Sequence, residues 1–334
     1  MNLDEFAKDF LPRVERYIDQ IIRTDIEHLE KASKHLIKAG GKRLRPLMLG
    51  LFTKAFDGDV ENAAIAGAAV EILHNFTLVH DDIMDRDQFR RGVPTTHVVF
   101  GEPMAILAGD YLYAKAYRAL LWLKDRVDDH KLVKIIDLLN KASEIVAEGQ
   151  ALDLTLPSYH EVSEEQYIDM IYRKTSSLFM AAAGIGVMLG RSSEQDVEKA
   201  IEYARYAGIA FQIRDDILGL LGDPSVTGKP VLNDLREGKR TILVIHAFKE
   251  ASDFDKNEML RIIGNKEASI KDLEKAKDLV IKYGGVKKAE DLAKSYLEKA
   301  LKVLDEIERR ALNKDSIYII KDLIVLISLL PVYT

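Results

Sequence analysis

The chain has 334 residues, of which 47% are hydrophobic and 31% charged, enough for one large domain or two of average size. Its net charge of −6, without a basic tail, argues against nucleic acid as the main partner. It contains no cysteine, which excludes disulfides, thiolate metal sites and cysteine nucleophiles and suits a reducing compartment.

Apolar residues recur at three- and four-residue spacing along almost the whole chain, and strand-like alternation is nearly absent. The first such stripe consists of Leu3, Phe6, Phe10, Val14, Tyr17 and Ile21. We therefore predict an all-α fold of about a dozen helices. Breaks are expected at the glycine- and proline-containing segments 40–41, 57–59, 92–94, 157–158 and 222–224. No linker-like segment divides the chain, so we expect residues 1–334 to form a single domain.

Nothing in the sequence indicates a targeting signal or an integral membrane segment. The N-terminus is acidic within its first five residues, unlike secretory or transit signals. The longest uncharged run, Thr175 to Gly190, has 16 residues and includes three glycines. A membrane helix needs about 20 apolar residues. We therefore expect a soluble, cytoplasmic protein.

The segment 65–79 is apolar on all sides, with Glu71 as its single charged residue, and it leads into three aspartates, Asp81, Asp82 and Asp85. Helices of this kind belong in the interior of a bundle. Asp81 and Asp85 share one helix face, where like charges repel each other unless a divalent cation binds there. Ligation by oxygen alone favours Mg²⁺ over Zn²⁺. The alternative is an ordinary solvated acidic helix end.

A second apolar helix, predicted over 204–220, carries Asp215 and Asp216 near its end. Two such helices can face each other across a cavity, with cations between them that hold a diphosphate. Basic residues lie close to both acidic clusters in the sequence, at Lys42, Arg43, Arg45, Arg90, Arg91, Arg173, Lys174, Lys229, Lys239 and Arg240. Each of these residues, taken alone, is typical of a solvated surface charge. Their grouping in a chain of net negative charge favours phosphate binding.

Two histidines of the first apolar helix allow more than one interpretation. His74 lies two turns before Asp81 on nearly the same face, and is either a satisfied core histidine or a hydrogen-bond donor to a phosphate. His80 and Asp81 form the His-Asp pair found in metal-dependent phosphohydrolases. That alternative requires further histidine ligands at suitable spacing. It also leaves Asp215 and Asp216 unexplained.

The motifs, in this order, resemble those of the trans-isoprenyl diphosphate synthase family, and among its members the archaeal geranylgeranyl diphosphate synthases. The resemblance runs from about Gly40 to Arg240. It rests on GGKRLRP (40–46), LVHDDIMD (78–85), RRG (90–92), GDYL (109–112), EGQALD (148–153), KTSSLF (174–179), FQIRDDIL (211–218) and GKP (228–230).

The resemblance implies a helical bundle around a deep central cavity, the isoprenoid synthase fold, assembled as a homodimer with diphosphate substrates and about two to three Mg²⁺ ions per site. The implied catalytic residues are Asp81, Asp82, Asp85, Lys174 and Asp215, of which Asp81, Asp85 and Asp215 would bind the metal. The implied ligands of isopentenyl diphosphate are Lys42, Arg45, His74 and Arg91. The implied ligands of the allylic diphosphate are Arg90, Lys174, Thr175, Gln212, Lys229 and Lys239.

The implied reaction is head-to-tail prenyl transfer through an allylic cation, in a cavity whose apolar walls exclude water. Product length would depend on Phe76 and Leu73, about 7.5 Å and 12 Å below Asp81 along the helix. An aromatic residue at position 76 is similar to the archaeal geranylgeranyl pattern and predicts a C20 product. Ideal helix geometry turns Phe76 about 140° away from Asp81, so geometry alone does not place it in the cavity.

The sequence departs from the family pattern at two places. Gly219 stands where many relatives have a third aspartate, and the C-terminal residues 330–334 lack the basic side chains that often close the site. A C15 or bifunctional short-chain synthase remains the nearest alternative. More distant ones are a non-catalytic subunit of a heteromeric synthase and the His-Asp phosphohydrolase. A terpene cyclase or head-to-head synthase is disfavoured by segment 40–46, which indicates a second diphosphate substrate.

Overall fold

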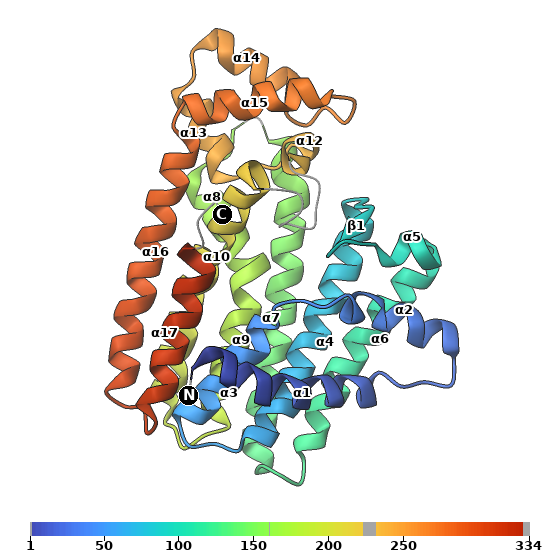
Figure 1. Cartoon of the computed structure of the whole chain (residues 1–334), viewed down its shortest axis with the longest axis vertical. Helices are drawn as coiled ribbons and strands as arrows, with labels where there is room; N and C mark the ends of the chain where they lie inside the picture. Colours follow the sequence, from blue (N-terminus) through green and yellow to red (C-terminus); the bar gives the residue numbers. More distant parts are fainter. Residues whose placement is uncertain (1, 160, 223–231, 330–334) are drawn as a thin grey trace. The chain divides into compact units, whose positions relative to one another are not determined.

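The computed structural model describes residues 2–159, 161–222 and 232–329. Helices dominate these residues, which confirms the predicted all-α class (Figure 1). The described part also contains a small hairpin that the sequence patterns did not predict. Its antiparallel strands are β1 (Phe89–Arg90) and β2 (Val93–Pro94).

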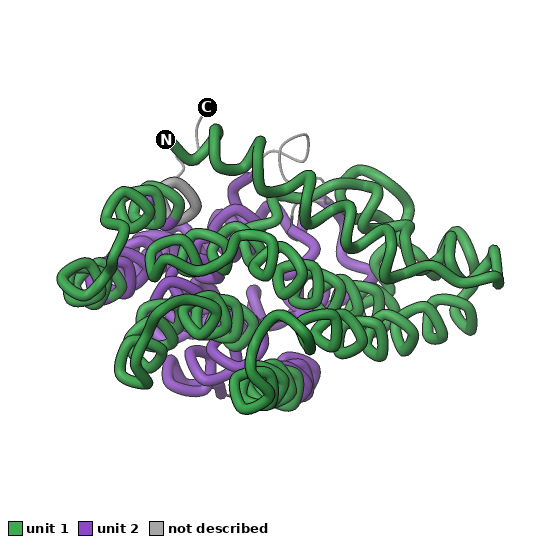
Figure 2. The backbone as a smooth tube through the Cα atoms, turned by 90° about the horizontal axis from the view of Figure 1, so that it is seen from below, with its two compact units in different colours: residues 1–144, 177–205, 300–323 green, residues 145–176, 206–299, 324–334 purple. Residues whose placement is uncertain are grey.

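The chain divides into two compact units, each assembled from three chain segments (Figure 2). Unit 1 comprises residues 1–144, 177–205 and 300–323, and unit 2 comprises residues 145–176, 206–299 and 324–334. Four helices carry residues of both units: α7 (Asp129–Thr155), α10 (Glu194–Leu221), α16 (Gly285–Glu308) and α17 (Lys314–Leu329).

The other helices of unit 1 are α1 (Leu3–Ile21), α2 (Glu27–Lys38), α3 (Leu44–Ala55), α4 (Val60–Met84), α5 (Thr96–Phe100), α6 (Glu102–Leu120) and α9 (Ser177–Met188), with a 3₁₀ turn at Leu121–Leu123. A capping box between Asn2 and Glu5 starts α1. The predicted apolar stripe of α1 is buried from Phe6 to Ile21, whereas Leu3 is half-buried. Helix α4 lies beside α6, and α3 packs on α9 (Figure 1).

Helix α4 is the central helix of unit 1. Most of its residues from Asn62 to Leu73 are alanine, glycine or aliphatic, and all of them are buried. Small side chains let α1, α3 and α6 approach it closely. Within the described residues, α4 is also the one helix long and apolar enough to cross a membrane. Since 72% of its most apolar window is buried inside the protein, its composition fits a core helix.

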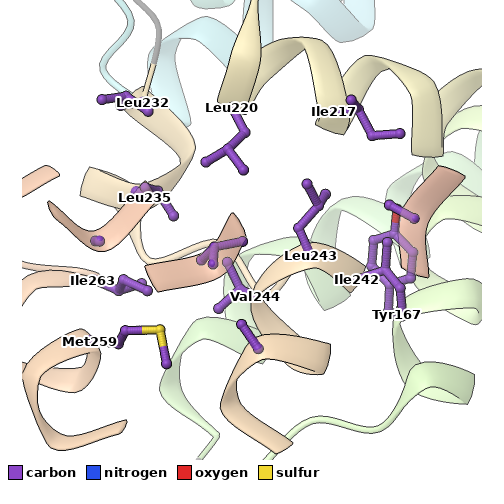
Figure 3. Packing of buried hydrophobic residues seen from close by; sticks show 14 of the residues in the cluster. Tyr167, Ile217, Leu220, Leu232, Leu235, Ile242, Leu243, Val244, Met259 and Ile263 are labelled. Carbon is purple, nitrogen blue, oxygen red and sulfur yellow. The ribbon is translucent and has the colours of Figure 1, made fainter. Parts of the chain in front are cut away.

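The other helices of unit 2 are α8 (Glu164–Ile171), α12 (Asn233–Glu237), α13 (Ile242–Glu250), α14 (Asp253–Ile262) and α15 (Ile270–Lys282), with a 3₁₀ turn at Leu156–Ser158 and a π-helical turn at Tyr172–Ser176. Aliphatic side chains of α10, α12 and α13 form its core (Figure 3). Ile217, Leu220 and Leu243 are buried there together with Tyr167 of α8. This packing fixes the last turns of α10, which carry the second acidic motif.

Candidate active site

The first acidic motif lies at the C-terminal end of α4. Asp81 and Asp82 belong to its last turn, and Asp85 caps the helix, with its amide donating to the Asp81 carbonyl at 2.8 Å. The C-terminus is the negative end of the helix dipole, which disfavours carboxylates there. The motif is therefore stable only if cations compensate for its charge. The sequence predicted Mg²⁺ as such a cation.

Arg90 on β1 supplies one of these cations. Its Nε donates to Asp82 Oδ1 at 2.5 Å, and its Nη2 lies 3.3 Å from Asp81 Oδ2 and 3.8 Å from Asp87 Oδ2. Burial alone lowers the pKa of Arg90, but the charges of Asp82 and Asp81 outweigh it and raise that pKa above its ordinary value. Arg90 therefore forms ion pairs with the first acidic motif.

The hairpin turn sends the next residue to a different place. Arg91 and Gly92 both have positive φ, 55° and 74°, as a two-residue type I′ turn requires. The Arg91 guanidinium donates to the carbonyl of Leu36 at 2.9 Å and to that of Gly40. Two consecutive arginines thus serve two different sites, Arg90 the carboxylates and Arg91 the loop between α2 and α3.

That loop contains the Gly40-Gly41 pair, whose φ values are 95° and 137°. A Cβ atom at Gly41 would lie 2.9 Å from the guanidinium carbon of Arg91 and 3.0 Å from Arg43 Nη1. Only glycine therefore fits at position 41. Arg43 itself is buried, and it bonds Glu15 at 2.7 Å, Glu71 at 3.1 Å and the Ile37 carbonyl at 2.7 Å.

The predicted ligands of isopentenyl diphosphate gather around this loop. Arg45 stacks over the ring of Phe179, and its buried Nε has no hydrogen-bond partner among the described residues. Burial lowers the pKa of Arg45 to about 10, and the charge of Arg91 contributes to this shift. Burial and the charges of Arg45 and Arg91 also lower the pKa of His74 well below its ordinary value, so the imidazole is neutral at pH 7. Lys42 is exposed.

Burial is the largest cause of both pKa shifts, and the positive charge of neighbouring arginines adds to it. Glu71 is a buried carboxylate that faces the arginines, and its charge opposes the lowering of the Arg45 pKa. Burial raises the pKa of Glu71, and the charges of the arginines oppose that rise. An anion bound here would relieve the remaining repulsion. Arg43 and Glu71 were absent from the predicted ligands because their role depends on partners far away in the sequence.

His80 belongs to the packing of α4 on α6. A Cβ atom at Gly109 would lie 2.1 Å from His80 Nε2, and this nitrogen is 3.2 Å from the Ile106 carbonyl. Within the described part of the chain, no three histidine, aspartate or glutamate side chains group closely enough to hold a metal by themselves. The geometry therefore does not support the histidine-ligated metal centre of a phosphohydrolase.

Phe76 is half-buried and faces α6. Its ring centroid lies 4.9 Å from that of His80 and 5.2 Å from that of Tyr113. Tyr113 in turn contacts Tyr117, whose hydroxyl is 2.6 Å from Ser143 Oγ on α7. Leu73, one turn earlier, is fully buried. Phe76 is thus the first ring of an aromatic row that sequence spacing did not reveal.

In unit 2, the predicted allylic-diphosphate ligands form two connected groups, of which the first is centred on Asp153. Lys174 lies in the π-helical turn, a feature often found at functional sites. Its Nζ is 2.6 Å from Asp153 Oδ2, and Lys239 Nζ is 3.8 Å from the same oxygen. Asp153 is 9% exposed and was not among the predicted site residues. It holds the two lysines near each other.

The second group is centred on Asp216. Thr175 donates to Gln212 Oε1 at 2.6 Å, and Gln212 donates to Asp216 Oδ1 at 2.8 Å. The hydroxyl of Tyr167 donates to the other oxygen of Asp216 at 2.6 Å. Burial and the charge of Asp234 outweigh these hydrogen bonds and raise the pKa of Asp216 to about 8. Asp215, the predicted metal ligand, is exposed.

Gly219, the departure from the family pattern, faces Asp234. A Cβ atom at Gly219 would lie 2.8 Å from Asp234 Oδ2. Asp216, Gly219, Asp234 and Lys239 line one pocket of unit 2. A carboxylate from α12 therefore lies beside the position where other sequences have their third aspartate. Lys229 and the C-terminal residues 330–334 lie outside the described residues.

The oxygen ligands present fit Mg²⁺. This ion is commonly held by one or two carboxylates together with substrate phosphates and water, so it does not need a complete protein cage. Asp81 and Asp85 offer carboxylates at the end of α4, and Asp215 offers an exposed one on α10. The repulsion among the carboxylates of α4 is the physical reason for a cation there.

Comparison with known proteins identifies the family of the chain. The model of the polyprenyl synthetase family matches residues 26–280. The chain belongs to this family. The geranylgeranyl diphosphate synthase of Saccharolobus solfataricus is 46% identical over 306 residues, 92% of each chain. The geranylfarnesyl diphosphate synthase of Aeropyrum pernix is 44% identical over 299 residues, 88% of this chain and 92% of the other.

Among solved structures, the polyprenyl synthase of Caulobacter crescentus, complexed with calcium and isoprenyl diphosphate, has a TM-score of 0.89 at 30% identity. The alignment covers 98% of this chain and 96% of the other. As a polyprenyl synthetase with these relatives, the protein is a prenyltransferase with the all-α isoprenoid synthase fold. Both predictions from the motifs are confirmed.

The raised pKa of Asp216 predicts a pH-dependent stability. Between pH 4 and 8 the folded protein keeps a proton on Asp216 that the unfolded chain has released, so stability falls as pH rises through this window. The Asp216→Asn variant lacks this penalty. Urea unfolding in EDTA should show that the stability of the variant relative to wild type increases from pH 5 to pH 8 and is constant above about pH 9. A difference that does not vary with pH would contradict the prediction.

Proposed function

We propose that the protein joins an allylic diphosphate to isopentenyl diphosphate, head to tail, and releases mainly geranylgeranyl diphosphate. The observation that carries this proposal is the pair of chemically different anion sites in unit 1. The acidic motif needs a divalent cation to bind a diphosphate, whereas the arginine loop can bind one directly. Arg90 and Arg91, adjacent in one turn, serve the two sites separately. These two sites would suit a reaction with two diphosphate substrates, one bound through a metal ion and the other bound directly by arginines.

We propose Asp81, Asp85 and Asp215 as ligands of about two to three Mg²⁺ ions, with Asp82 in support. The metal would supply positive charge that stabilises the leaving diphosphate. Arg90 in unit 1 and Lys174, Thr175, Gln212 and Lys239 in unit 2 would bind the allylic diphosphate. Lys42, Arg45, His74 and Arg91 would bind isopentenyl diphosphate, to which neutral His74 can donate a hydrogen bond.

In the reaction, the carbon–oxygen bond of the allylic diphosphate breaks, and its electron pair leaves with the diphosphate. The double bond of isopentenyl diphosphate attacks the allylic cation and forms the new carbon–carbon bond. The resulting cation loses a proton to the departed diphosphate, which restores a double bond. Cationic side chains stabilise the diphosphate as it leaves, and apolar walls keep water from the cation.

We further propose that residues 1–334 form one catalytic domain and that the protein is cytoplasmic, which the lack of cysteine suits. We also propose a homodimer. The exposed apolar side chains of α5 and α6, Val98, Val99, Ile106, Leu107 and Tyr113, form a surface of the kind found at subunit interfaces.

Sedimentation velocity tests the dimer. We expect wild type to sediment with twice the mass of the chain. Leu107→Asp places a charge on the apolar surface and should shift the protein to monomer. The control, Phe254→Asp, alters an exposed residue of α14 and should leave the dimer intact. A monomeric wild type at micromolar concentration would contradict this proposal.

Product analysis tests the reaction. Dimethylallyl and isopentenyl diphosphates with Mg²⁺ should give a C20 alcohol after phosphatase treatment, and EDTA should abolish it. Asp81→Ala should lower the rate by about 10²–10³-fold, because charge stabilisation of the leaving group is lost. The control, Asp137→Ala, removes an exposed aspartate of α7 and should leave both the rate and the C20 product unchanged. No elongation with any allylic primer would favour a non-catalytic subunit.

The Phe76→Ala variant tests product length. Removal of the first ring of the aromatic row opens space below the acidic motif, so we expect products longer than C20. The matched control is Phe254→Ala, in which an exposed ring of α14 is lost and the C20 product should persist. Chromatography of the alcohols measures both. An unchanged product from Phe76→Ala would exclude Phe76 as the determinant of length, and a wild-type C15 product would favour farnesyl diphosphate synthesis.

A further inference from the structure

Glu71 is the only charged residue between Asn62 and Val79 and is 2% exposed. Its Oε1 accepts hydrogen bonds from Arg43 Nη1 at 3.1 Å and from Asn75 Nδ2 at 3.2 Å. A carboxylate so deep in an apolar helix is unfavourable unless it is paired. No step of the prenyl transfer described above uses it, so its presence requires another explanation.

The charges around Glu71 indicate what it does. Burial raises the pKa of Glu71 above its ordinary value, and the positive charges of the three guanidinium groups that face it, those of Arg43, Arg45 and Arg91, oppose this rise. Arg43 has a second carboxylate partner in the half-exposed Glu15. Within the described residues, Arg45 has no carboxylate in salt-bridge distance, and Arg91 donates to carbonyls. One buried carboxylate therefore faces one buried and two half-buried cations.

The geometry of the loop depends on these charges. Arg43 and Arg91 both lie against Gly41, and both donate to the Gly40 carbonyl. Like charges this close repel strongly in a buried setting. Glu71 lies on α4, the rigid centre of the unit, and attracts them toward one point. A diphosphate would contribute the negative charge that a single carboxylate lacks.

We propose that Glu71 is a positioning residue, the built-in counter-ion of the isopentenyl diphosphate site. It holds Arg43, Arg45 and Arg91 together while the site is empty, and the bound diphosphate completes the neutralisation. This inference rests on the proposed function for the identity of the ligand. This role depends on the negative charge of Glu71 and not on the shape of its side chain, so packing alone does not account for it.

The test measures thermal unfolding of the full chain with inorganic diphosphate as probe, in EDTA so that the acidic motifs stay metal-free. Glu71→Gln keeps the shape and removes the charge. We expect it to lower Tm without ligand, and diphosphate to raise Tm more than in wild type. Because the anion then meets arginines without a competing carboxylate, its Kd should fall about tenfold. Titration calorimetry measures the Kd directly.

Two variants separate charge from packing. Glu71→Asp keeps the charge on a shorter side chain, and its response to diphosphate should match that of wild type even if its Tm is lower. Glu61→Gln is the matched control on the same helix, because the side chain of Glu61 bonds Arg13, Arg16 and Tyr17 of α1 and not the loop arginines. It should lower Tm without any change in the diphosphate Kd.

The outcomes are distinct. An equal diphosphate response in wild type and Glu71→Gln overturns the counter-ion role, as does an equal change in Glu71→Asp and Glu71→Gln. If Glu71→Gln is unfolded without ligand, recovery of its helical circular dichroism on addition of diphosphate supports the proposal, and failure to recover overturns it. A wild type that does not respond to diphosphate or isopentenyl diphosphate in EDTA overturns the proposed isopentenyl site, and with it this role.

Discussion

Charge buried along an apolar helix is the constraint on which unit 1 depends. Helix α4 packs closely because most of its middle is alanine, glycine and aliphatic residues, yet it carries Glu71 there and three aspartates at its end. Both positions are unfavourable unless cations compensate for them. The arginine loop compensates at Glu71 and Arg90 compensates at Asp81 and Asp82. The arrangement of cations in this unit follows from these two requirements.

Backbone geometry then decides which cation serves which site. Arg90 and Arg91 are neighbours in the sequence and chemically identical, but the type I′ turn directs them to different partners. The absence of a side chain at Gly41 similarly leaves room for two guanidinium groups at one point of the loop. A few residues in uncommon conformations therefore separate the cation of the first acidic motif from the cations of the arginine loop.

Unit 2 follows the same electrostatic rule. Asp153, buried, lies between Lys174 and Lys239 and keeps two cations close to each other, as Glu71 does with arginines. Asp216, by contrast, lies among carboxylates, and burial without a cation favours its protonated form. A cation close to Asp216 would favour its ionised form.

The sequence by itself determined the helical class, the apolar stripes and the two acidic motifs, because these are properties of local spacing and composition. The β hairpin escaped prediction since strands of two residues have no periodicity. The roles of Glu71, Asp153 and Asp234 depend on the tertiary structure alone. Each acts through groups that are distant in the chain, and whether a buried charge is paired, repelled or left for a ligand depends on distances that only the folded chain sets.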